Sequence, residues 1–353
     1  MKHSIPSAIS LAAILFFAAG AAAAEDPAGF TLNENDYSFA ANVKSPDRFD
    51  AWRSKVLYFY HKTLRIRPDY QALPPDVKFG EKKRIGDRVT RYEISYATTD
   101  GLRIPAFLFV PDTEAKVPAV IVYHGHGPGK INAAEGENTN ETALARYLAE
   151  KLGYVTLAPD ARSFGEFKIP GKQSHYDYYF SLIFKNKLYM SKLMEDGYQD
   201  LALLRTVERA DPERLGVAGI SMGSWRTLNF TVMHGEVDAA VVAGLYIPWK
   251  YLFSEAHCRC QHVPKLAEKL GMADLAATVF PRKLMIQWGL EDGFYKQEAE
   301  DLISKTAATA DFLGCPDSFR VDRHEGMGHR FSNPEIAEFF VEALGQGAWP
   351  PEN

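Results

Sequence analysis

The stretch that decides the fold is Leu215-Gly216-Val217-Ala218-Gly219-Ile220-Ser221-Met222-Gly223. Its apolar first half is typical of a buried strand, and residues 222–233 have the spacing of a helix. Ser221 therefore lies at a sharp strand-to-helix turn, in the pattern G-x-S-x-G. A side chain in place of Gly219 or Gly223 would collide with the neighbouring strand or helix. An ordinary turn could carry the same residues by chance, but the flanking strand and helix favour a nucleophilic serine.

Strands and helices alternate on both sides of this turn. Residues 88–98 and 102–110 alternate in polarity around Thr99-Asp100-Gly101 and are predicted to form an antiparallel hairpin. The pattern predicts an α/β fold with about eight strands, mostly parallel, and helices on both faces of the sheet. The remaining strands are expected at 117–123, 154–158, 215–220, 239–247, 283–288 and 318–323, and the helices at 142–152, 187–210, 222–233, 296–312 and 334–344.

The predicted catalytic domain spans residues 88–345. Residues 25–87 form an N-terminal extension, in which 46–64 have helical apolar spacing and are expected to pack on the core. Two loop insertions, 161–187 and 248–280, are longer than ordinary connections. Because both follow the carboxyl ends of strands, where α/β sheets bind ligands, we expect them to wall the site.

Residues 1–24 have the features of a signal peptide. Lys2 supplies the positive start, an apolar stretch follows, and Ala22-Ala23-Ala24 precedes acidic residues. A membrane-spanning helix needs about 20 apolar residues, whereas this stretch is shorter and rich in weakly hydrophobic alanine. Cleavage after Ala24, with no stable membrane insertion afterwards, is therefore expected, and the protein should be periplasmic or extracellular.

Composition and charge exclude some classes of protein. The 353 residues are 46% hydrophobic and 24% charged with a net charge of −5, as in ordinary globular enzymes. No basic run interleaves with aromatic residues, so a nucleic-acid partner is not expected. Cys258, Cys260 and Cys315 are too few for a disulfide scaffold, and both one bridge and free thiols are compatible with the sequence. Cys258-Arg259-Cys260 lacks the usual spacing of zinc ligands and a second pair.

A nucleophilic serine needs a histidine base held by a carboxylate, in the chain order Ser, Asp or Glu, His. Gly289-Leu290-Glu291-Asp292-Gly293 follows the strand at 283–288, so either Glu291 or Asp292 could supply the carboxylate. The loop after the last strand offers His324 and His329. His329 is preferred because Gly326-Met327-Gly328 lets its loop turn back over the sheet, whereas His324 is expected within the strand.

The loop after the strand at 117–123 reads His124-Gly125-His126-Gly127-Pro128-Gly129. In serine hydrolases with this nucleophile turn, this loop supplies one backbone N–H to the oxyanion and the residue after the serine supplies the other. We therefore expect the N–H groups of His126 and Met222 to form the oxyanion hole. A metal held by His124 and His126 is disfavoured because no acidic or histidine partner stands at suitable spacing, and no metal or cofactor is expected.

Substrate contacts are expected from the insertions, at Arg162, Tyr178, Tyr179 and Trp249. Aromatic side chains beside such a site could stack on sugars or hold an aromatic acyl group. They could equally pack the loops onto the body of the protein.

With these residues in place, the chain resembles the dienelactone-hydrolase-like and acetyl-xylan-esterase-like branch of the α/β-hydrolase superfamily over about 88–344. The resemblance implies the α/β-hydrolase fold, Ser221 as nucleophile, Asp292 rather than Glu291 as acid, and His329 as base. Dienelactone hydrolases use a cysteine nucleophile, so Ser221 points to ordinary esters, with acetyl esters of sugars favoured. The motifs that carry it are His124-Gly125-His126-Gly127, Asp160-Ala161-Arg162, Phe164-Gly165-Glu166, Gly219 to Gly223, Gly289 with Asp292, and Gly328-His329.

The sequence thus predicts an exported serine hydrolase that cleaves carboxylic esters through an acyl-enzyme. One alternative is a peptidase or amidase of the prolyl-oligopeptidase type, for which residues 25–87 are too few to form the usual propeller. Another is a non-catalytic binding protein on the same scaffold, which would be expected to lack a triad residue. The sequence has a candidate at each of the three positions.

Overall fold

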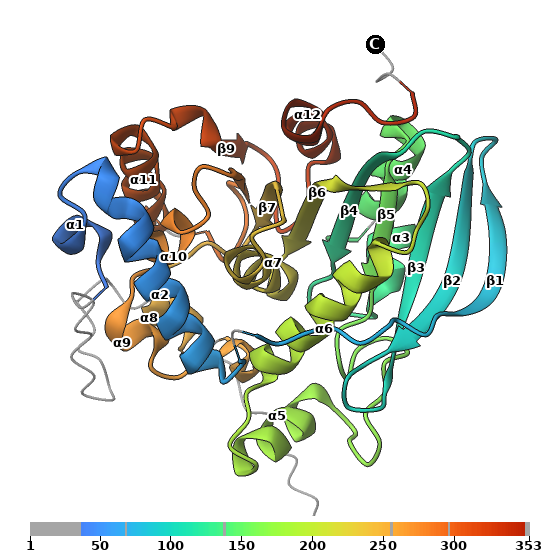
Figure 1. Cartoon of the computed structure of the whole chain (residues 1–353), viewed down its shortest axis with the longest axis horizontal. Coiled ribbons are helices and arrows are strands. Elements are labelled where there is room, and N and C mark those ends of the chain that lie inside the picture. Colours follow the sequence, from blue (N-terminus) through green and yellow to red (C-terminus); the bar gives the residue numbers. More distant parts are fainter. Residues whose placement is uncertain (1–36, 68, 137–138, 255–256, 296, 350–353) are drawn as a thin grey trace, which may run out of the picture.

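The computed structural model describes residues 37–67, 69–136, 139–254, 257–295 and 297–349 (Figure 1). The predicted signal peptide, residues 1–24, and the first part of the predicted extension lie outside the described residues. Within the described ranges, no helix has the length and apolar character needed to cross a bilayer.

A single sheet of nine strands organises the described chain, in the order β1-β2-β3-β5-β4-β6-β7-β8-β9 (Figure 1). β1 to β3 and the β3–β5 pair are antiparallel, and all pairs from β5–β4 to β8–β9 are parallel. The predicted α/β fold and its antiparallel hairpin are confirmed. The strands are β1 Lys78–Ile85, β2 Val89–Ala97, β3 Arg103–Pro111, β4 Val117–Tyr123, β5 Val155–Pro159, β6 Ala210–Ile220, β7 Ala239–Ala243, β8 Lys283–Gly289 and β9 Phe319–His324.

Strand β1 is the one that the sequence pattern did not predict, and it lies within the segment assigned to the N-terminal extension. All of its residues except Ile85 are exposed, because it is an edge strand that pairs only with β2. Its sequence is mostly charged and lacks the alternation that marks a half-buried strand. Charged side chains are typical of edge strands, since they discourage pairing with other chains.

The sheet carries a hydrophobic core on each face. Residues of β4 alternate between them: Ala119, Ile121 and Tyr123 join the core under α2, α6 and α7, and Val120 and Val122 join the core under α4 and α12. The α-helices are α1 Phe39–Asn42, α2 Phe49–Leu64, α3 Lys130–Glu135, α4 Leu144–Leu152, α5 His175–Phe184, α6 Tyr189–Leu204, α7 Met222–Met233, α8 Trp249–Leu252, α9 Leu266–Lys269, α10 Met272–Ala277, α11 Gln297–Phe312 and α12 Asn333–Leu344. Short 3-10 helices span Pro46–Arg48, Arg259–Gln261 and Pro316–Ser318.

The two long insertions contain helices of their own. Residues 161–187 include α5, and residues 248–280 include α8, the 3-10 helix Arg259–Gln261, α9 and α10. The first insertion leaves the carboxyl end of β5 and the second leaves that of β7, so both start from the same edge of the sheet as the turn after β6.

A buried histidine makes stability depend on pH. His234, just after α7, is buried between the rings of Tyr198 and Phe230, and its Nε2 has no hydrogen-bond partner in the described chain. Burial lowers the pKa of His234 from its ordinary 6.5 to about 3. The unfolded chain therefore binds this proton first as the pH falls.

We expect the free energy of unfolding to be highest above pH 6.5 and to fall by about 1.4 kcal/mol per pH unit from this residue alone between pH 6 and 4. Urea unfolding of wild type and His234→Phe across that range measures the effect. The slope of the free energy of unfolding against pH should be smaller in the variant by the contribution of one proton. Equal slopes in the two proteins would contradict the assignment.

Candidate active site

Ser221 occupies a strained turn that its neighbours make tight. It precedes α7 with φ 58° and ψ −123°, which non-glycine residues rarely adopt. A Cβ at Gly219 would lie 2.2 Å from the carbonyl oxygen of Gly223, and one at Gly223 would lie 2.1 Å from that of Tyr123. The prediction that these glycines allow close approach is confirmed. The Ser221 N–H donates to the carbonyl of Ala243 (3.0 Å), which fixes the turn beside the end of β7.

Asp292 and His329 meet across the loops that follow β8 and β9. Leu290 and Glu291 donate backbone hydrogen bonds to the carbonyls of His324 and Met327 (2.9 and 3.0 Å), so the two loops are held together. His329 Nδ1 lies 2.6 Å from Asp292 Oδ2. Asp292 Oδ1 accepts from the Phe294 N–H (2.8 Å), and the Asp292 carboxylate is almost fully buried. A buried carboxylate with two donors is well placed to orient an imidazole.

The competing candidates lie elsewhere. Glu291 is exposed, and His324 is the last residue of β9, with Nε2 2.7 Å from Asp322 Oδ2. The structure therefore brings together the carboxylate and the imidazole that the resemblance selected, and leaves Glu291 and His324 out of that pair.

Gly244 places Ser221 beside the Asp292–His329 pair. It follows Ala243, the acceptor of the Ser221 N–H, and a Cβ on it would lie 2.8 Å from His329 Cε1 and 3.2 Å from Asp292 Oδ2. Among the described residues, the Ser221 hydroxyl makes no hydrogen bond to the imidazole. Such bonds are often long in a free enzyme and shorten when substrate binds.

The loop after β4 packs directly against Ser221. A Cβ on Gly125 would lie 3.2 Å from that of Ser221, and the Gly125 N–H donates to the buried carboxylate of Glu141 (2.9 Å). His124 Nε2 accepts from the Ala161 N–H (2.9 Å), so its proton is on Nδ1 and points to the Gly125 carbonyl (2.6 Å). Burial lowers the pKa of His124, so the imidazole is neutral and acts as a structural link.

The backbone N–H groups of His126 and Met222 are available to donate hydrogen bonds to a substrate, as an oxyanion hole requires. In the part of the chain that the structure describes, neither donates to a protein acceptor. Met222 is the first residue of α7, where N–H groups lack partners within the helix and carry the positive end of its dipole.

A buried ion pair fixes the far end of this loop. Asp160, after β5, accepts from the backbone N–H of Lys130 (2.6 Å) and of Glu166 (2.8 Å), and Lys130 Nζ lies 3.4 Å from Asp160 Oδ2. A Cβ on Gly129 or Gly165 would lie 2.1 or 2.2 Å from Asp160 Oδ1. The glycines of both loops thus leave space for one buried carboxylate.

The four predicted substrate contacts are buried. Arg162 has no exposed surface and hydrogen-bonds to both oxygens of Asp196 and of Asp100. Tyr178 lies against Arg162, and Tyr179 is 9% exposed. Trp249 donates through Nε1 to the Leu270 carbonyl (2.7 Å). These side chains pack the insertions onto the body, which was the alternative interpretation of the aromatic residues.

Phe294 is a site residue that the sequence reasoning missed. Its ring centroid lies 5.1 Å from that of His329, and the rings meet at 67°. It is partly exposed, although it follows the buried acid by only two positions. Its place directly after Asp292-Gly293 was the available signal, but nothing in the sequence indicates which way the ring turns.

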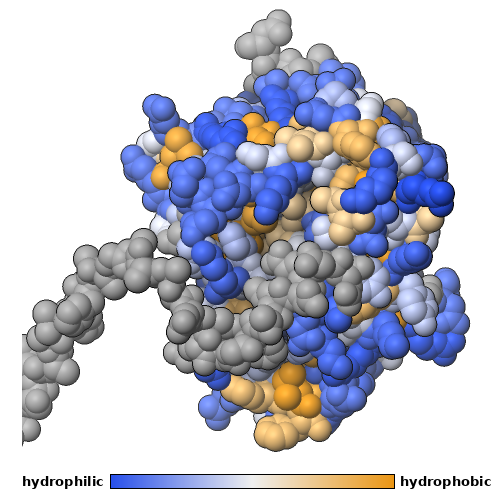
Figure 2. Space-filling view, turned by 90° about the vertical axis from the view of Figure 1, so that its left-hand side faces the viewer, coloured by the Kyte–Doolittle hydropathy of each residue, from blue (hydrophilic) through white to orange (hydrophobic). Residues whose placement is uncertain are grey.

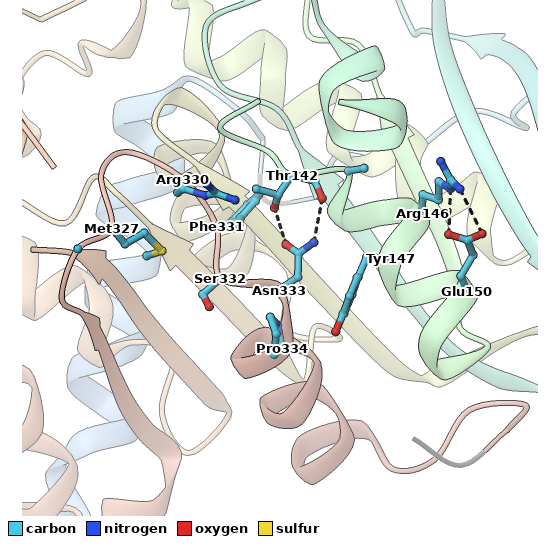
Figure 3. Close-up of a pocket in the computed structure, with 12 residues that line it drawn as sticks. Thr142, Arg146, Tyr147, Glu150, Met327, Arg330, Phe331, Ser332, Asn333 and Pro334 are labelled. Carbon is cyan, nitrogen blue, oxygen red and sulfur yellow. Dashed lines mark hydrogen bonds and ion pairs between the residues drawn. The ribbon is translucent and has the colours of Figure 1, made fainter. Parts of the chain in front are cut away.

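Hydrogen bonds hold the loop that carries His329 in place around the pocket of about 490 Å³ shown in Figure 3. The Phe331 N–H donates to the carbonyl of Asn140 (2.9 Å), and the Asn333 amide donates to that of Thr142 (2.8 Å). Glu141, between these two acceptors, holds Gly125. One short segment therefore links the loop that carries His329 to the loop after β4, in which we expect one half of the oxyanion hole.

Among the residues that the structure describes, two clusters have donor atoms that could hold a metal. One contains Asp322, His324 and Glu335. The other contains His126, His175, Cys258 and Cys260, with one donor atom from each residue and all of these atoms within 4.8 Å of one another. Sequence spacing did not predict either cluster, because each combines side chains from at least two separate elements.

The sheet order, the strained serine turn and the Asp–His pair after the last two strands define an enzyme of the α/β-hydrolase class. The sequence profile described as acetyl xylan esterase (AXE1) matches residues 37–250. The chain belongs to the acetyl xylan esterase family and is a carboxylic ester hydrolase.

The chain is also similar to known proteins in sequence and in fold. The chain is 28% identical over 243 residues to YtaP of Bacillus subtilis strain 168, across 64% of this chain and 78% of YtaP. Its fold resembles that of BF1801 from Bacteroides fragilis (TM-score 0.67, 17% identity, 83% and 79% of the two chains). It also resembles a glucuronoyl esterase from Solibacter usitatus (TM-score 0.60, 13% identity, 89% and 98%).

The contact between the acid and histidine loops predicts a matched pair of glycine variants. A Cβ on Gly289 would lie 2.1 Å from the Met327 carbonyl oxygen, whereas nothing lies within 4 Å of one on Gly328. We expect Gly289→Ala to cost roughly 1–3 kcal/mol or more in the free energy of unfolding, and to lower ester hydrolysis by separating the loops. Gly328→Ala should leave stability within about 0.5 kcal/mol. Equal destabilisation by both would contradict the contact.

Proposed function

We propose that the protein is an exported serine esterase that deacetylates carbohydrates through a Ser221-His329-Asp292 triad. The observation that carries this proposal is the 2.6 Å hydrogen bond between His329 and a buried Asp292, formed beside the strained Ser221 turn. Family membership supports ester hydrolysis as the reaction, and the geometry supports these residues as its agents.

Catalysis proceeds in two acyl-transfer steps. His329 Nε2 accepts the Ser221 proton as the hydroxyl oxygen attacks the ester carbonyl, and Asp292 holds the imidazole tautomer and stabilises the resulting cation. The imidazolium then protonates the leaving alcohol, and the acyl group remains on Ser221. Water, activated by the same imidazole, attacks the acyl-enzyme and releases the acid, which restores the serine.

The N–H groups of His126 and Met222 stabilise the negative charge of each tetrahedral intermediate. Both are unpaired in the described chain. Met222 directly follows Ser221 at the start of α7, and His126 directly follows Gly125, on which a Cβ would lie 3.2 Å from that of Ser221. Donors already aimed at the developing charge need no reorganisation during the reaction, and one such donor typically contributes 100- to 1,000-fold in rate.

The family supports an acetyl ester of a carbohydrate as substrate, and the surface near the site is compatible with it. Apolar side chains gather at the lower end of Figure 2, where α5 lies. Phe180 and Phe184 of α5 are 43% and 89% exposed, and Tyr176 is exposed beside His175. Exposed aromatic rings near a hydrolytic centre suit stacking on sugar rings.

Hydrolysis of p-nitrophenyl esters from acetate to octanoate, and acetate release from acetylated xylo-oligosaccharides, tests the proposal with residues 25–353. We expect acetate to be the preferred acyl group. Ser221→Ala, His329→Gln and Asp292→Asn should each lower kcat/KM at least about 1,000-fold, because the triad acts as a unit.

The rival side chains supply matched controls for these variants. His324→Gln and Glu291→Gln should stay within about 2-fold of wild type, because neither residue belongs to the Asp292–His329 pair. Full activity in Ser221→Ala would refute the nucleophile, and loss in His324→Gln with retention in His329→Gln would refute the base. No hydrolysis of any ester above the Ser221→Ala level would favour a peptidase or a binding protein.

Export rests on the targeting features of residues 1–24. When the full chain is expressed in a bacterial host, we expect the protein outside the cytoplasm with Glu25 as its first residue, because small residues precede that bond. N-terminal sequencing of the fractionated protein checks this. A chain that keeps Met1 in the cytoplasmic fraction would contradict export.

A further inference from the structure

Three loops that are far apart in sequence bring two imidazoles and two thiols together at the edge of the site. His126 comes from the loop after β4, His175 begins α5, and Cys258 and Cys260 are at the 3-10 helix of the second insertion. His126 Nε2 lies 3.4 Å from Cys260 Sγ, and His175 Nε2 lies 3.3 Å from Cys258 Sγ. The two sulfurs lie 2.7 Å apart.

These donors match a known kind of metal centre. Two histidines and two cysteines form the tetrahedral Cys₂His₂ set of structural zinc sites, with bonds of about 2.0–2.3 Å. Ligand atoms at those bond lengths lie about 3.3–3.8 Å from one another. Both nitrogen–sulfur distances fall at the short end of that range, and the sulfurs need to separate by about 1 Å. Thiolate ligands favour zinc over magnesium or calcium.

The surroundings hold these side chains in place. The Phe164 ring stacks on His175 with centroids 4.9 Å apart and meets the His126 ring edge-on at 5.5 Å. Cys260 is buried, and the next residue, Gln261, accepts a hydrogen bond from the Trp225 indole (2.9 Å) on the helix after the nucleophile. Ring orientation and backbone position are thus set by contacts outside the cluster, as in preorganised metal sites.

We propose that His126, His175, Cys258 and Cys260 bind one Zn²⁺ and that this ion fastens both insertions to the oxyanion loop. Four protein ligands close the tetrahedron, so the ion has a structural role and leaves no position for a reacting water. Its link to catalysis rests on the proposed function. The His126 side chain binds the ion while the backbone N–H of the same residue faces the oxyanion.

This proposal replaces the expectation of no metal that the sequence supported. The sequence disfavoured a metal because no acidic or histidine residue stands at suitable spacing near His124 and His126. In the structure, the His124 imidazole is already hydrogen-bonded to Ala161 and Gly125. The side chains that could bind a metal together with His126 belong to the two insertions.

The test measures metal content in purified residues 25–353, prepared without added chelator and again after reduction and reconstitution with Zn²⁺. Native mass spectrometry and elemental analysis should give about one zinc per chain. Cys260→Ser and His175→Gln should lose it. Cys315→Ser should keep it, because Cys315 lies outside both candidate clusters. Circular dichroism that matches wild type in all three variants shows that loss of metal is not loss of fold.

Thiol counting separates the ion from its chemical rival, a Cys258–Cys260 disulfide. With zinc bound, denaturation with chelator should release three reactive thiols, one for each cysteine of the chain. A single reactive thiol, together with failure of the reduced protein to take up zinc, would overturn the proposal. So would equal zinc content in wild type and Cys260→Ser.

Activity then relates the ion to the catalytic site. Removal of zinc should lower the melting temperature and reduce ester kcat/KM roughly 10-fold or more, because the oxyanion loop loses its support. One zinc per chain with no esterase activity would uphold the metal site and refute the proposed function. Full esterase activity in a chain that binds no zinc would uphold the proposed function and refute the metal site.

Discussion

The structure depends on how closely the chain approaches itself around Ser221. A Cβ on Gly219 would collide with the backbone of Gly223, and one on Gly223 would collide with the backbone of Tyr123. The end of β6, the start of α7 and the end of β4 therefore lie at van der Waals distance from one another. This contact forces Ser221 into a backbone conformation that costs of order 1–3 kcal/mol. The surrounding sheet supplies that energy, because its central strands are buried on both faces. The turn lies at the carboxyl end of β6, at the edge of the sheet from which both insertions also start.

Buried carboxylates then position those loops. Glu141 holds Gly125 of the oxyanion loop, Asp160 joins that loop to the first insertion, and Asp292 orients His329. An unpaired buried charge costs several kcal/mol, so each carboxylate strongly favours the one loop geometry that supplies its donors. The zinc that we propose would add a fourth anchor of this kind, at the point where both insertions reach the oxyanion loop. In this enzyme, polar contacts between loops achieve what hydrophobic packing achieves within the sheet.

The local sequence was sufficient to predict a helix or strand wherever the residues of that element alone determine its structure. The strand at 117–123 and the helix at 222–233 match β4 and α7 at both ends, because a continuous apolar run and a glycine-flanked serine are unambiguous. The charged strand β1 escaped prediction, since an edge strand needs no apolar face. Arg162 was expected to meet substrate because it follows a strand end, yet Asp196 and Asp100 enclose it. A buried ion pair and an exposed arginine look alike in sequence.

By itself, the sequence determined the α/β order, the strand-to-helix turn at Ser221 and the order in which the candidate serine, acid and histidine follow one another, since these are properties of the chain order. Only the tertiary structure brings the side chains of Asp292 and His329 together and leaves Glu291 and His324 out of that pair. That pairing depends on which side chains face each other across two loops. The cluster of His126, His175, Cys258 and Cys260 is likewise invisible in the spacing of its members. Side chains more than a hundred residues apart become neighbours only when the sheet brings the carboxyl ends of its strands to one edge.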